Sequence, residues 1–313
     1  MGAAQETTVR SESNLVSVPA LVKDAQGRVV YGLTTKDFVI EDDGVEQTVR
    51  LDETPEGQPV SLVLAIEKGR RASYEFARME GLKTMLDPLF ALGRARVAVV
   101  EFDSQVVLTR DFSSDQNLIE RDVSDLRPGD DGAAILDAIH YAMGLLKKEA
   151  DDRLRVLLLI SETRDHGSRM KIENSVAAVG EANALFYALA FSPALSNILD
   201  TGRGNNTSLK PGPNEMHPDL NFLDLAYRTA QAMRRNVPET VTRMTGGEYE
   251  LFATRKRFDT HMNDFTNHLR GRYLLSFTPR NPHPGLHRLG VKLAERNQST
   301  VLARTSYWVE SPK

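Results

Sequence analysis

Several groups of side chains along this chain are of types that carry chemistry. The turn Asp130–Gly132 offers paired carboxylates for acid/base work or for a metal ion, but it directly precedes a helical pattern beginning at Ala134, as a solvated turn does. The segment Asp165–Ser168 brings three catalytic residue types together, yet adjacency in sequence is not triad geometry, and no strand-to-helix nucleophile elbow precedes the serine. No phosphate loop, dinucleotide fingerprint or kinase signature occurs in the sequence. These patterns do not predict an enzyme.

The histidines are scattered, and two pairs of them invite a metal interpretation. His261 and His268 lie near one face of a predicted helix but lack a carboxylate at ligand spacing, which favours a surface or half-buried helix over a zinc site. His283 and His287 flank a Pro-Gly turn and could chelate a metal ion weakly, but a surface loop is the better interpretation.

Composition excludes several classes of protein. The 39 basic and 43 acidic residues are interspersed and give a formal net charge of −4, so there is no electrostatic footprint for nucleic acid. With 0 Cys, disulfides and thiolate metal sites are excluded. No apolar run approaches the roughly 20 residues that a bilayer crossing needs, so an integral membrane protein is not predicted.

The start of the chain bears on location. Residues 1–13 are expected to be a disordered or vector-derived tail, because the small, polar segment Met1–Thr7 does not resemble a signal peptide. A native cytoplasmic start looks similar, but we favour the interpretation that an export signal has been trimmed from this start. That interpretation predicts a secreted, periplasmic or cell-envelope location.

From Val60 onward, short apolar strands alternate with amphipathic helical patterns. Continuous apolar runs such as Val156–Ile160 are typical of strands buried on both faces, and strand–helix alternation indicates parallel strands with crossover helices. The sequence therefore predicts an α/β fold with a doubly wound, mainly parallel sheet and helices on both faces. The expected strands are Ser61–Ile66, Arg96–Phe102, Arg155–Ile160, Ala184–Phe191, Glu248–Phe252 and Tyr273–Thr278, and the expected helices are Tyr74–Leu92, Ala134–Lys148, Lys171–Ala182, Asn221–Met244 and Arg257–Leu269.

Both ends of the chain have a different, strand-like pattern. Residues 14–55 contain the hairpin signal Asp42–Val45, in which an Asp-Gly step lies between alternating runs. Residues 280–313 continue with a Pro-Gly turn and further strand patterns. Because neither piece is large enough to stand alone, we expect the two to pair into one small β module. The expected strands after the turn are His287–Leu293 and Thr300–Val309.

The expected α/β domain spans residues 60–279. Its ligand site should lie at the carboxyl ends of the central strands, where the loops after Ile66, around Gly132 and after Ile160 should meet. The longest irregular stretch, Ser192–Asp219, has no apolar periodicity, so it is either a binding loop or a disordered insertion.

The order of these elements resembles the von Willebrand factor A (VWFA) domain, and specifically the VWFA-related proteins of Acidobacteria. The resemblance covers nearly the whole chain, including the leading Glu41–Gly44, the α/β core and the closing Arg272–Pro279. It implies a Rossmann-like core and an adhesion-type role in protein binding. Such domains hold a divalent cation through Asp-x-Ser-x-Ser on one loop, a Thr on a second and an Asp on a third.

At the corresponding positions, this sequence departs from the family pattern. Glu67, Gly69 and Arg71 stand where Asp, Ser and Ser are expected. On the second loop Ala133 replaces the Thr, and on the third Glu162 replaces the Asp. The resemblance therefore implies a degenerate metal site, with no tightly bound cofactor expected and Mg²⁺ or Ca²⁺ as the remaining alternative.

The leading hypothesis is a non-catalytic module that binds an acidic protein partner directly, where relatives would use a cation. We also expect Arg71 or Arg164 to form salt bridges with the two glutamates of the rim. One alternative is a structural or scaffold protein of the cell envelope that associates through the edges of its β module. Another is metal-dependent binding through a rearranged site. The candidate partner-binding residues are Lys68, Arg70, Arg71, Asp130, Asp131, Arg164 and Asp165.

Overall fold

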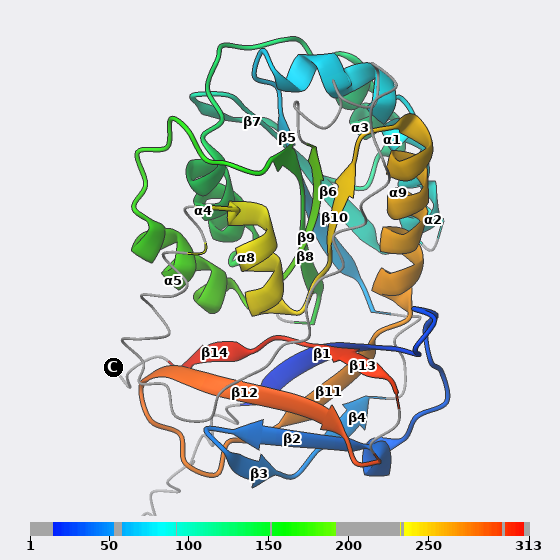
Figure 1. The fold of residues 1–313 in the computed structure, drawn as a ribbon, viewed down its shortest axis with the longest axis vertical. Helices are drawn as coiled ribbons and strands as arrows, with labels where there is room; N and C mark the ends of the chain where they lie inside the picture. Colours follow the sequence, from blue (N-terminus) through cyan, green and yellow to red (C-terminus); the bar gives the residue numbers. More distant parts are fainter. Residues whose placement is uncertain are drawn as a thin grey trace, which may run out of the picture.

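The computed structural model describes residues 15–52, 58–91, 93–150, 152–191, 232, 235–295 and 298–309. These residues form an α/β unit and a smaller β unit, drawn at the top and bottom of Figure 1. Within these ranges, no helix combines the length and the apolar character that a membrane crossing requires.

The α/β unit is built on a six-stranded sheet with the order β10-β9-β8-β5-β6-β7. Neighbouring strands are parallel except for the antiparallel pair β6 and β7. In the centre of the sheet, Leu62 of β5 pairs with Val97 on one side and Val156 on the other. The expected doubly wound, mainly parallel sheet is confirmed. Its strands are β5 (Val60–Glu67), β6 (Ala95–Phe102), β7 (Val106–Ser113), β8 (Leu154–Glu162), β9 (Leu185–Phe191) and β10 (Tyr249–Phe252).

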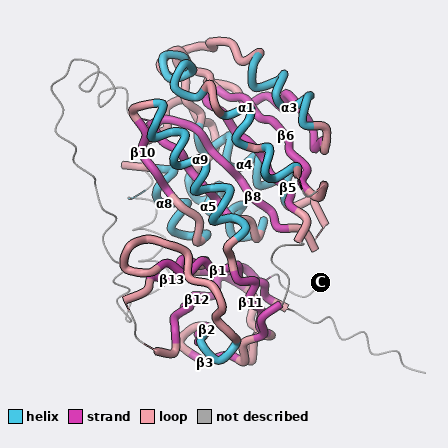
Figure 2. Tube along the Cα trace, turned by 90° about the vertical axis from the view of Figure 1, so that its right-hand side faces the viewer, coloured by secondary structure: helices cyan, strands magenta, loops and turns pink. Residues whose placement is uncertain are grey.

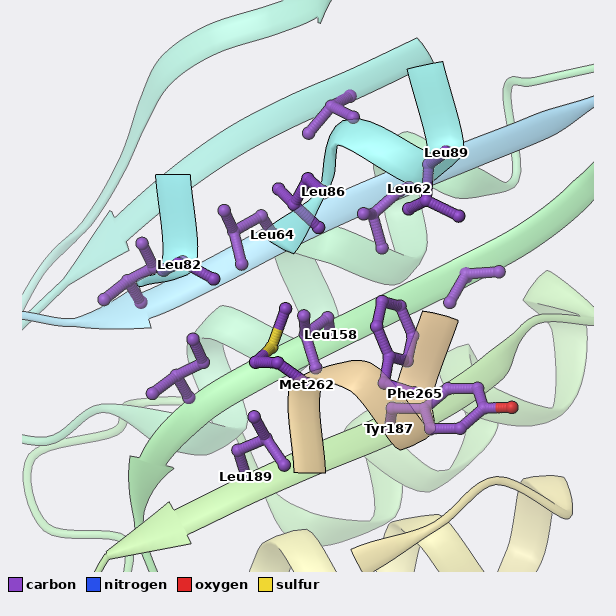
Figure 3. Close-up of a cluster of buried hydrophobic side chains, with 14 of the residues drawn as sticks. Leu62, Leu64, Leu82, Leu86, Leu89, Leu158, Tyr187, Leu189, Met262 and Phe265 are labelled. Carbon is purple, nitrogen blue, oxygen red and sulfur yellow. The ribbon is translucent and has the colours of Figure 1, made fainter. Parts of the chain in front are cut away.

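Side chains of β5 alternate between two separate apolar cores. Leu62 and Leu64 belong to one core, and Val63 and Ala65 belong to the other. Because helices cover both faces, the strands are apolar throughout rather than alternating. One face of the sheet, shown in Figures 2 and 3, is covered by η3 (Ala72–Met79), α1 (Leu82–Met85), α2 (Asp87–Phe90), α3 (Gln116–Ser124) and α9 (Arg255–Arg270). The other face is covered by α4 (Ile135–Leu146), α5 (Ile172–Ala182) and α8 (Val237–Thr245).

Two parts of the α/β unit differ from expectation. The single helix expected over Tyr74–Leu92 is wrong, because the chain forms the 3-10 helix η3 and the short helices α1 and α2. Gly81 separates the first two, and Pro88, which cannot donate a backbone hydrogen bond, starts the third. The edge strand β7 and the helix α3 were not predicted. Along β7 most side chains alternate between half-buried and exposed, so no apolar run marks the strand.

The stretch Ser192–Asp219 lies outside the described residues, as do most of residues 221–234 in the helix expected over Asn221–Met244. The later part of that helix is α8. Asn236 caps it, since its side-chain oxygen accepts a hydrogen bond from the backbone N–H of Glu239.

The β unit consists of two four-stranded sheets with the orders β13-β1-β11-β4 and β14-β12-β2-β3. Both sheets combine strands from the two ends of the chain, which confirms the expected small β module. Between the sheets, the rings of Phe38 and Tyr273 lie 5.2 Å apart and those of Phe277 and Tyr307 lie 5.8 Å apart. The elements of this unit are β1 (Val16–Lys23), η1 (Thr35–Asp37), β2 (Phe38–Asp42), β3 (Val45–Gln47), β4 (Arg50–Asp52), β11 (Tyr273–Phe277), β12 (Gly285–Leu293), β13 (Thr300–Leu302) and β14 (Ser306–Val309).

Strand β11 was expected in the larger sheet but belongs to the β unit. It pairs antiparallel with β1 and β4, and Leu275 and Phe277 are buried in the core of the β unit. The apolar pattern of a strand indicates that it is buried but not which sheet buries it. The chain therefore returns to the β unit as soon as α9 ends, before the boundary expected at Pro279.

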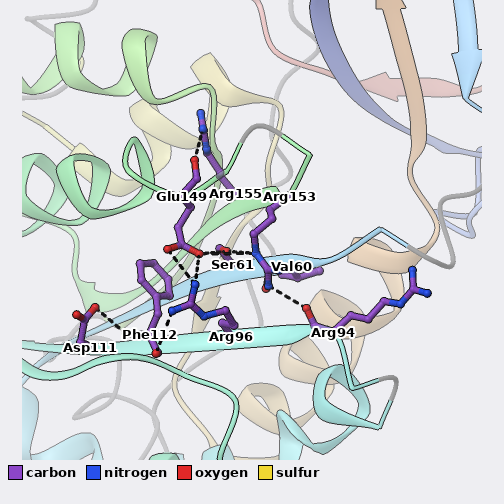
Figure 4. A network of polar contacts seen from close by, with 9 residues as sticks. All are labelled: Val60, Ser61, Arg94, Arg96, Asp111, Phe112, Glu149, Arg153 and Arg155. Atoms are coloured by element: carbon purple, nitrogen blue, oxygen red, sulfur yellow. Dashed lines mark hydrogen bonds and ion pairs between the residues drawn. The ribbon is translucent and has the colours of Figure 1, made fainter.

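A polar network fixes the amino-terminal ends of β5, β6 and β8 (Figure 4). Glu149 accepts hydrogen bonds from Ser61 Oγ at 2.6 Å and from Arg96 Nη1 at 3.2 Å. Arg153 donates to Ser61 Oγ at 2.6 Å and to the carbonyl of Val60 at 2.7 Å. The sheet is thus held at the end opposite the predicted site.

Candidate binding face

The carboxyl ends of the central strands form a face, here called the carboxyl-edge face, at the top of Figure 1. Backbone hydrogen bonds from Gly129 to Lys68 (2.7 Å) and from Arg70 to Asp130 (2.6 Å) join its first two loops. The loops that make up the face are Glu67–Ser73, Gly129–Ala133 and Ser161–Ser168.

The second and third loops are joined just as directly. Ala133 and His166 exchange two backbone hydrogen bonds, of 2.8 and 3.0 Å, in an isolated antiparallel bridge. Ala133 is fully buried there. The three loops are therefore held in contact by their own backbones.

Close approach of the backbones explains the glycines of this face. A Cβ on Gly69 would lie 2.5 Å from the carbonyl oxygen of Gly132, and a Cβ on Gly132 would lie 2.6 Å from the backbone of Ser104. Real Cβ atoms do not approach so closely, so a serine side chain at position 69 does not fit without moving the loop.

Glu67, at the end of β5, is almost completely buried, with 1% of its surface exposed. Its Oε2 accepts a hydrogen bond from the backbone N–H of Glu162 at 2.8 Å, while its Oε1 has no hydrogen-bond partner among the described residues. Burial raises the pKa of the Glu67 carboxyl to about 8, with a further contribution from the neighbouring Glu162 carboxylate. Glu67 is therefore held mostly as the neutral acid at neutral pH.

The second glutamate, Glu162, is paired with a histidine. Its Oε1 lies 2.6 Å from Nε2 of His166, four residues further on. The salt bridges expected from Arg71 or Arg164 to the two glutamates do not form among the described residues, although the charge of Arg71 acts to lower the pKa of Glu67. That expectation is wrong because both arginines extend into solvent while the glutamates face inward.

Two of the candidate carboxylates, those of Asp130 and Asp165, accept hydrogen bonds from backbone N–H groups of this face. Asp130 accepts hydrogen bonds from the backbone N–H of Ser104 (3.0 Å) and of Gly132 (2.8 Å), and a hydrogen bond from the Ser104 hydroxyl lowers the pKa of its carboxyl. Asp165 Oδ1 accepts from the backbone N–H of Leu136, at the start of α4, at 3.0 Å. These two side chains fasten loops, and their proposed contact with a partner stays a prediction.

The catalytic residue types in Asp165–Ser168 are not arranged as a triad. The Ser168 hydroxyl donates to Asp165 Oδ1 at 2.5 Å, whereas His166 Nε2 faces Glu162. Among the described residues no hydrogen bond joins Ser168 to His166, so the serine lacks the base that would activate it.

Exposed cations and an aromatic side chain surround the carboxyl-edge face. Arg70 makes a surface ion pair with Asp131 at 3.1 Å, with both side chains mostly exposed, and Lys68 Nζ lies 3.3 Å from Glu101 Oε2. Tyr74, at the start of η3, is 74% exposed. Arg71 and Arg164 are exposed and make no ion pair with any described residue. The local sequence pattern predicts Tyr74 only as the start of a helix and gives no signal that its ring is exposed.

The residues at the positions that correspond to the cation loops of VWFA domains do not fit a divalent cation. Gly69 and Ala133 offer no side-chain oxygen, Glu67 is buried and mostly neutral, and the Oε1 of Glu162 faces His166. Mg²⁺ and Ca²⁺ require several oxygen ligands around an open cavity. Here the loops meet backbone to backbone instead.

The half-buried helix expected for His261 and His268 is confirmed, but each of these histidines also meets a carboxylate. His268 Nδ1 lies 2.8 Å from Glu248 Oε2, and His261 Nδ1 lies 3.7 Å from Glu250 Oε2. Both carboxylates come from the segment around β10, so the helix spacing could not reveal them. His287, interpreted as a surface loop residue, is buried with 1% of its surface exposed.

No family model and no curated protein sequence matches this chain. Solved structures with some similarity of fold include the PilB minor pilin from Streptococcus sanguinis, with 13% identity over 70% of this chain and 63% of that one (TM-score 0.46). BatB from Bacteroides thetaiotaomicron has 14% identity over 67% of this chain and 98% of that one (TM-score 0.44). The vWF domain of the type V pili tip protein Mfa5 from Porphyromonas gingivalis has 15% identity over 35% and 39% of the two chains (TM-score 0.32). This chain thus spans well under two thirds of the Mfa5 structure. At these scores the likeness carries no argument about function.

Proposed function

We propose that this protein is a non-catalytic, adhesion-type module that binds an acidic protein surface through its carboxyl-edge face. The observation that supports this most is the pair of exposed cations, Arg71 and Arg164, on loops that are fixed to one another. Tyr74, three residues after Arg71, adds an exposed aromatic ring near the first of these loops. Arg and Tyr are the residue types that most often carry binding energy at protein interfaces.

Rigidity of the loops supports the same proposal. Backbone bonds between the loops and the internal contacts of Asp130 and Asp165 hold the face in one arrangement before a partner arrives. A preorganised face loses little conformational entropy on binding, which favours affinity. In this proposal the arginines contact the carboxylates of a partner directly, without a bridging Mg²⁺ or Ca²⁺.

The proposal also includes location outside the cytoplasm, in line with the resemblance to VWFA-related proteins. The scaffold alternative receives less support. Among the described residues, the edge strands of the β unit, β3, β4, β13 and β14, contain only three or four residues each. Short edge strands offer little template for pairing with another chain.

The test combines charge reversal with a matched control. An Arg71→Glu/Arg164→Glu variant should lose most of its affinity for a partner captured by the wild-type protein from an envelope extract and then purified. A Lys36→Glu/Lys148→Glu variant makes the same change of charge at exposed sites away from this face, on η1 of the β unit and just after the end of α4. It should bind as the wild type does. Equal affinity of the first variant and the wild type would rule out this face.

Cation dependence is tested separately. Chelator-stripped protein is titrated with Mg²⁺, Mn²⁺ and Ca²⁺ by calorimetry, and we expect no saturable binding at Glu67 and Glu162. Saturable binding by the wild-type protein that disappears in Glu67→Ala or Glu162→Ala would instead establish the rearranged metal site.

A further inference from the structure

A cluster of ligand atoms lies in the β unit, far along the chain from the carboxyl-edge loops. Asp43 follows β2, and His283 and His287 lie before and within β12, which runs beside β2 in Figure 1. One ligand atom from each of these three residues lies within 4.8 Å of the others. Asp42, beside Asp43, adds a second carboxylate to the group.

The tautomer of His287 follows from its surroundings. Its Nε2 lies 2.7 Å from the backbone carbonyl oxygen of His283, which can only accept, so Nε2 carries a proton. Its Nδ1 lies 3.0 Å from Asp42 Oδ1 and 3.0 Å from Asp43 Oδ2. In the neutral ring Nδ1 is also an acceptor. Three acceptor atoms therefore face one another, and either a second proton or a cation must lie among them.

The other polar atoms of the same side chains are already hydrogen-bonded. Asp42 Oδ2 accepts from the Tyr307 hydroxyl at 2.9 Å, and Asp43 Oδ1 accepts from the backbone N–H of Arg288 at 2.9 Å. Such outer contacts orient the ligands of metal sites, and a ligating histidine commonly donates its second N–H to a backbone carbonyl. Asp43, His283 and His287 thus each direct one ligand atom towards the others, and Asp42 Oδ1 lies against His287 Nδ1.

The distances suit a small transition-metal ion. Zinc bonds of about 2.1 Å in a tetrahedron place neighbouring ligand atoms roughly 3.4 Å apart. Here His283 Nε2 lies 3.4 Å from Asp43 Oδ2, and the two contacts of His287 Nδ1 are 3.0 Å. Two imidazoles with two carboxylates suit Zn²⁺ better than Mg²⁺ or Ca²⁺, which take oxygen ligands.

Two residues of the site, His287 and Asp42, are held by packing, whereas His283 and Asp43 are exposed and can adjust. The ring of His287 is stacked between those of His283 and Tyr307, at 4.0 and 4.8 Å, and both His287 and Asp42 are buried. His283 lies on a turn with its side chain 60% exposed, so its ring can turn out of the stack to direct Nε2 at an ion. The side chain of Asp43 is 40% exposed.

We propose that Asp42, Asp43, His283 and His287 form a binding site for Zn²⁺ or a similar divalent transition-metal ion. The ion neutralises two carboxylates and joins the β2–β3 turn to the start of β12, segments some 245 residues apart in sequence. The site is independent of the carboxyl-edge face and gives the β unit a metal-dependent stability.

The test is a titration of chelator-stripped protein with Zn²⁺ by calorimetry, with melting temperature followed in parallel. Saturable binding of one Zn²⁺ should raise the melting temperature, because the ion binds the folded state. Mg²⁺ and Ca²⁺ should do neither. Co²⁺ bound in its place should show the visible absorption of tetrahedral coordination.

Variants locate the site. His283→Gln and Asp43→Asn change exposed side chains, and Asn tolerates the left-handed backbone at position 43 (φ 48°). Each should weaken zinc binding by about 100-fold, and Tyr307→Phe by about 10-fold. Glu46→Gln, which removes a charge from exposed strand β3 of the same hairpin, should bind zinc as the wild type does. Absence of saturable zinc binding, or a zinc affinity of His283→Gln and Asp43→Asn equal to that of the wild type, would overturn the proposal.

Discussion

At the scale of single residues, Glu67 shows how one position can change the chemistry of a face. A carboxylate at the end of a central strand could bind a cation if it were ionised and surrounded by oxygen ligands. Burial instead holds Glu67 mostly neutral, and its Oε2 accepts a hydrogen bond from the backbone of Glu162. Glu67 therefore adds no exposed negative charge to this face, whereas Arg71 and Arg164 add exposed positive charges.

The substitution Glu67→Gln tests whether the buried carboxyl of Glu67 is neutral. With a folded-state pKa of about 8 against an ordinary value of 4.5, Glu67 ionises first in the unfolded chain as pH rises. The wild-type protein should therefore lose stability between pH 4.5 and about pH 8, and the variant should lose less. The difference between their free energies of unfolding should change by about 3 kcal/mol between pH 4.5 and about pH 7 in favour of the variant. Chemical denaturation at a series of pH values measures it. A difference that is constant with pH would mean that Glu67 ionises normally.

At the scale of elements, the two ends of the central sheet are fixed in different ways. Backbone bonds between loops fix the carboxyl ends, whereas the side chain of Glu149 gathers Ser61 and Arg96 at the amino ends, with Arg153 bound to the same serine. Glu149 is mostly buried, and Arg96 is partly exposed.

Glu149→Gln should therefore destabilise the protein by about 2 kcal/mol, less than for a fully buried pair because solvent screens Arg96. The free energy of unfolding from denaturant titration is the measurement. Glu181→Gln breaks the exposed pair between Lys147 and Glu181 and provides the control, with an expected change below about 0.5 kcal/mol. Equal effects of the two substitutions would show that the network adds nothing.

At the scale of the whole molecule, polar contacts connect the two units. Lys23 of β1 pairs with Glu248, which precedes β10 and also binds His268 of α9. Arg272, just before β11, donates to the Tyr187 hydroxyl of β9 at 2.9 Å. Burial opposes ionisation of Glu248, but the hydrogen bond from His268 and the charge of Lys23 outweigh it and lower the pKa to about 2.

Acid should consequently weaken this junction. A carboxyl whose pKa falls from 4.5 to about 2 on folding adds stability above pH 4.5 and loses it as pH falls towards 2. The stability advantage of the wild-type protein over Glu248→Gln should shrink by about 3 kcal/mol across that window, as measured by denaturation at each pH. Glu46→Gln is the surface control. An advantage that persists at pH 2 would contradict the role of Glu248.

The sequence by itself determined the elements whose burial is uniform or strictly periodic. The continuous apolar runs of β5, β8 and β9 and the Asp-Gly turn after β2 could be read directly, and so could the meeting of three loops at the carboxyl edge, since parallel strands end on one side of a sheet. Only the tertiary structure decided which sheet takes β11, that Glu162 faces His166 rather than an arginine, and that Asp43 meets His287. Local periodicity records how deeply a residue is buried, whereas the partner it meets depends on contacts between distant segments, and these arise only when the chain has folded.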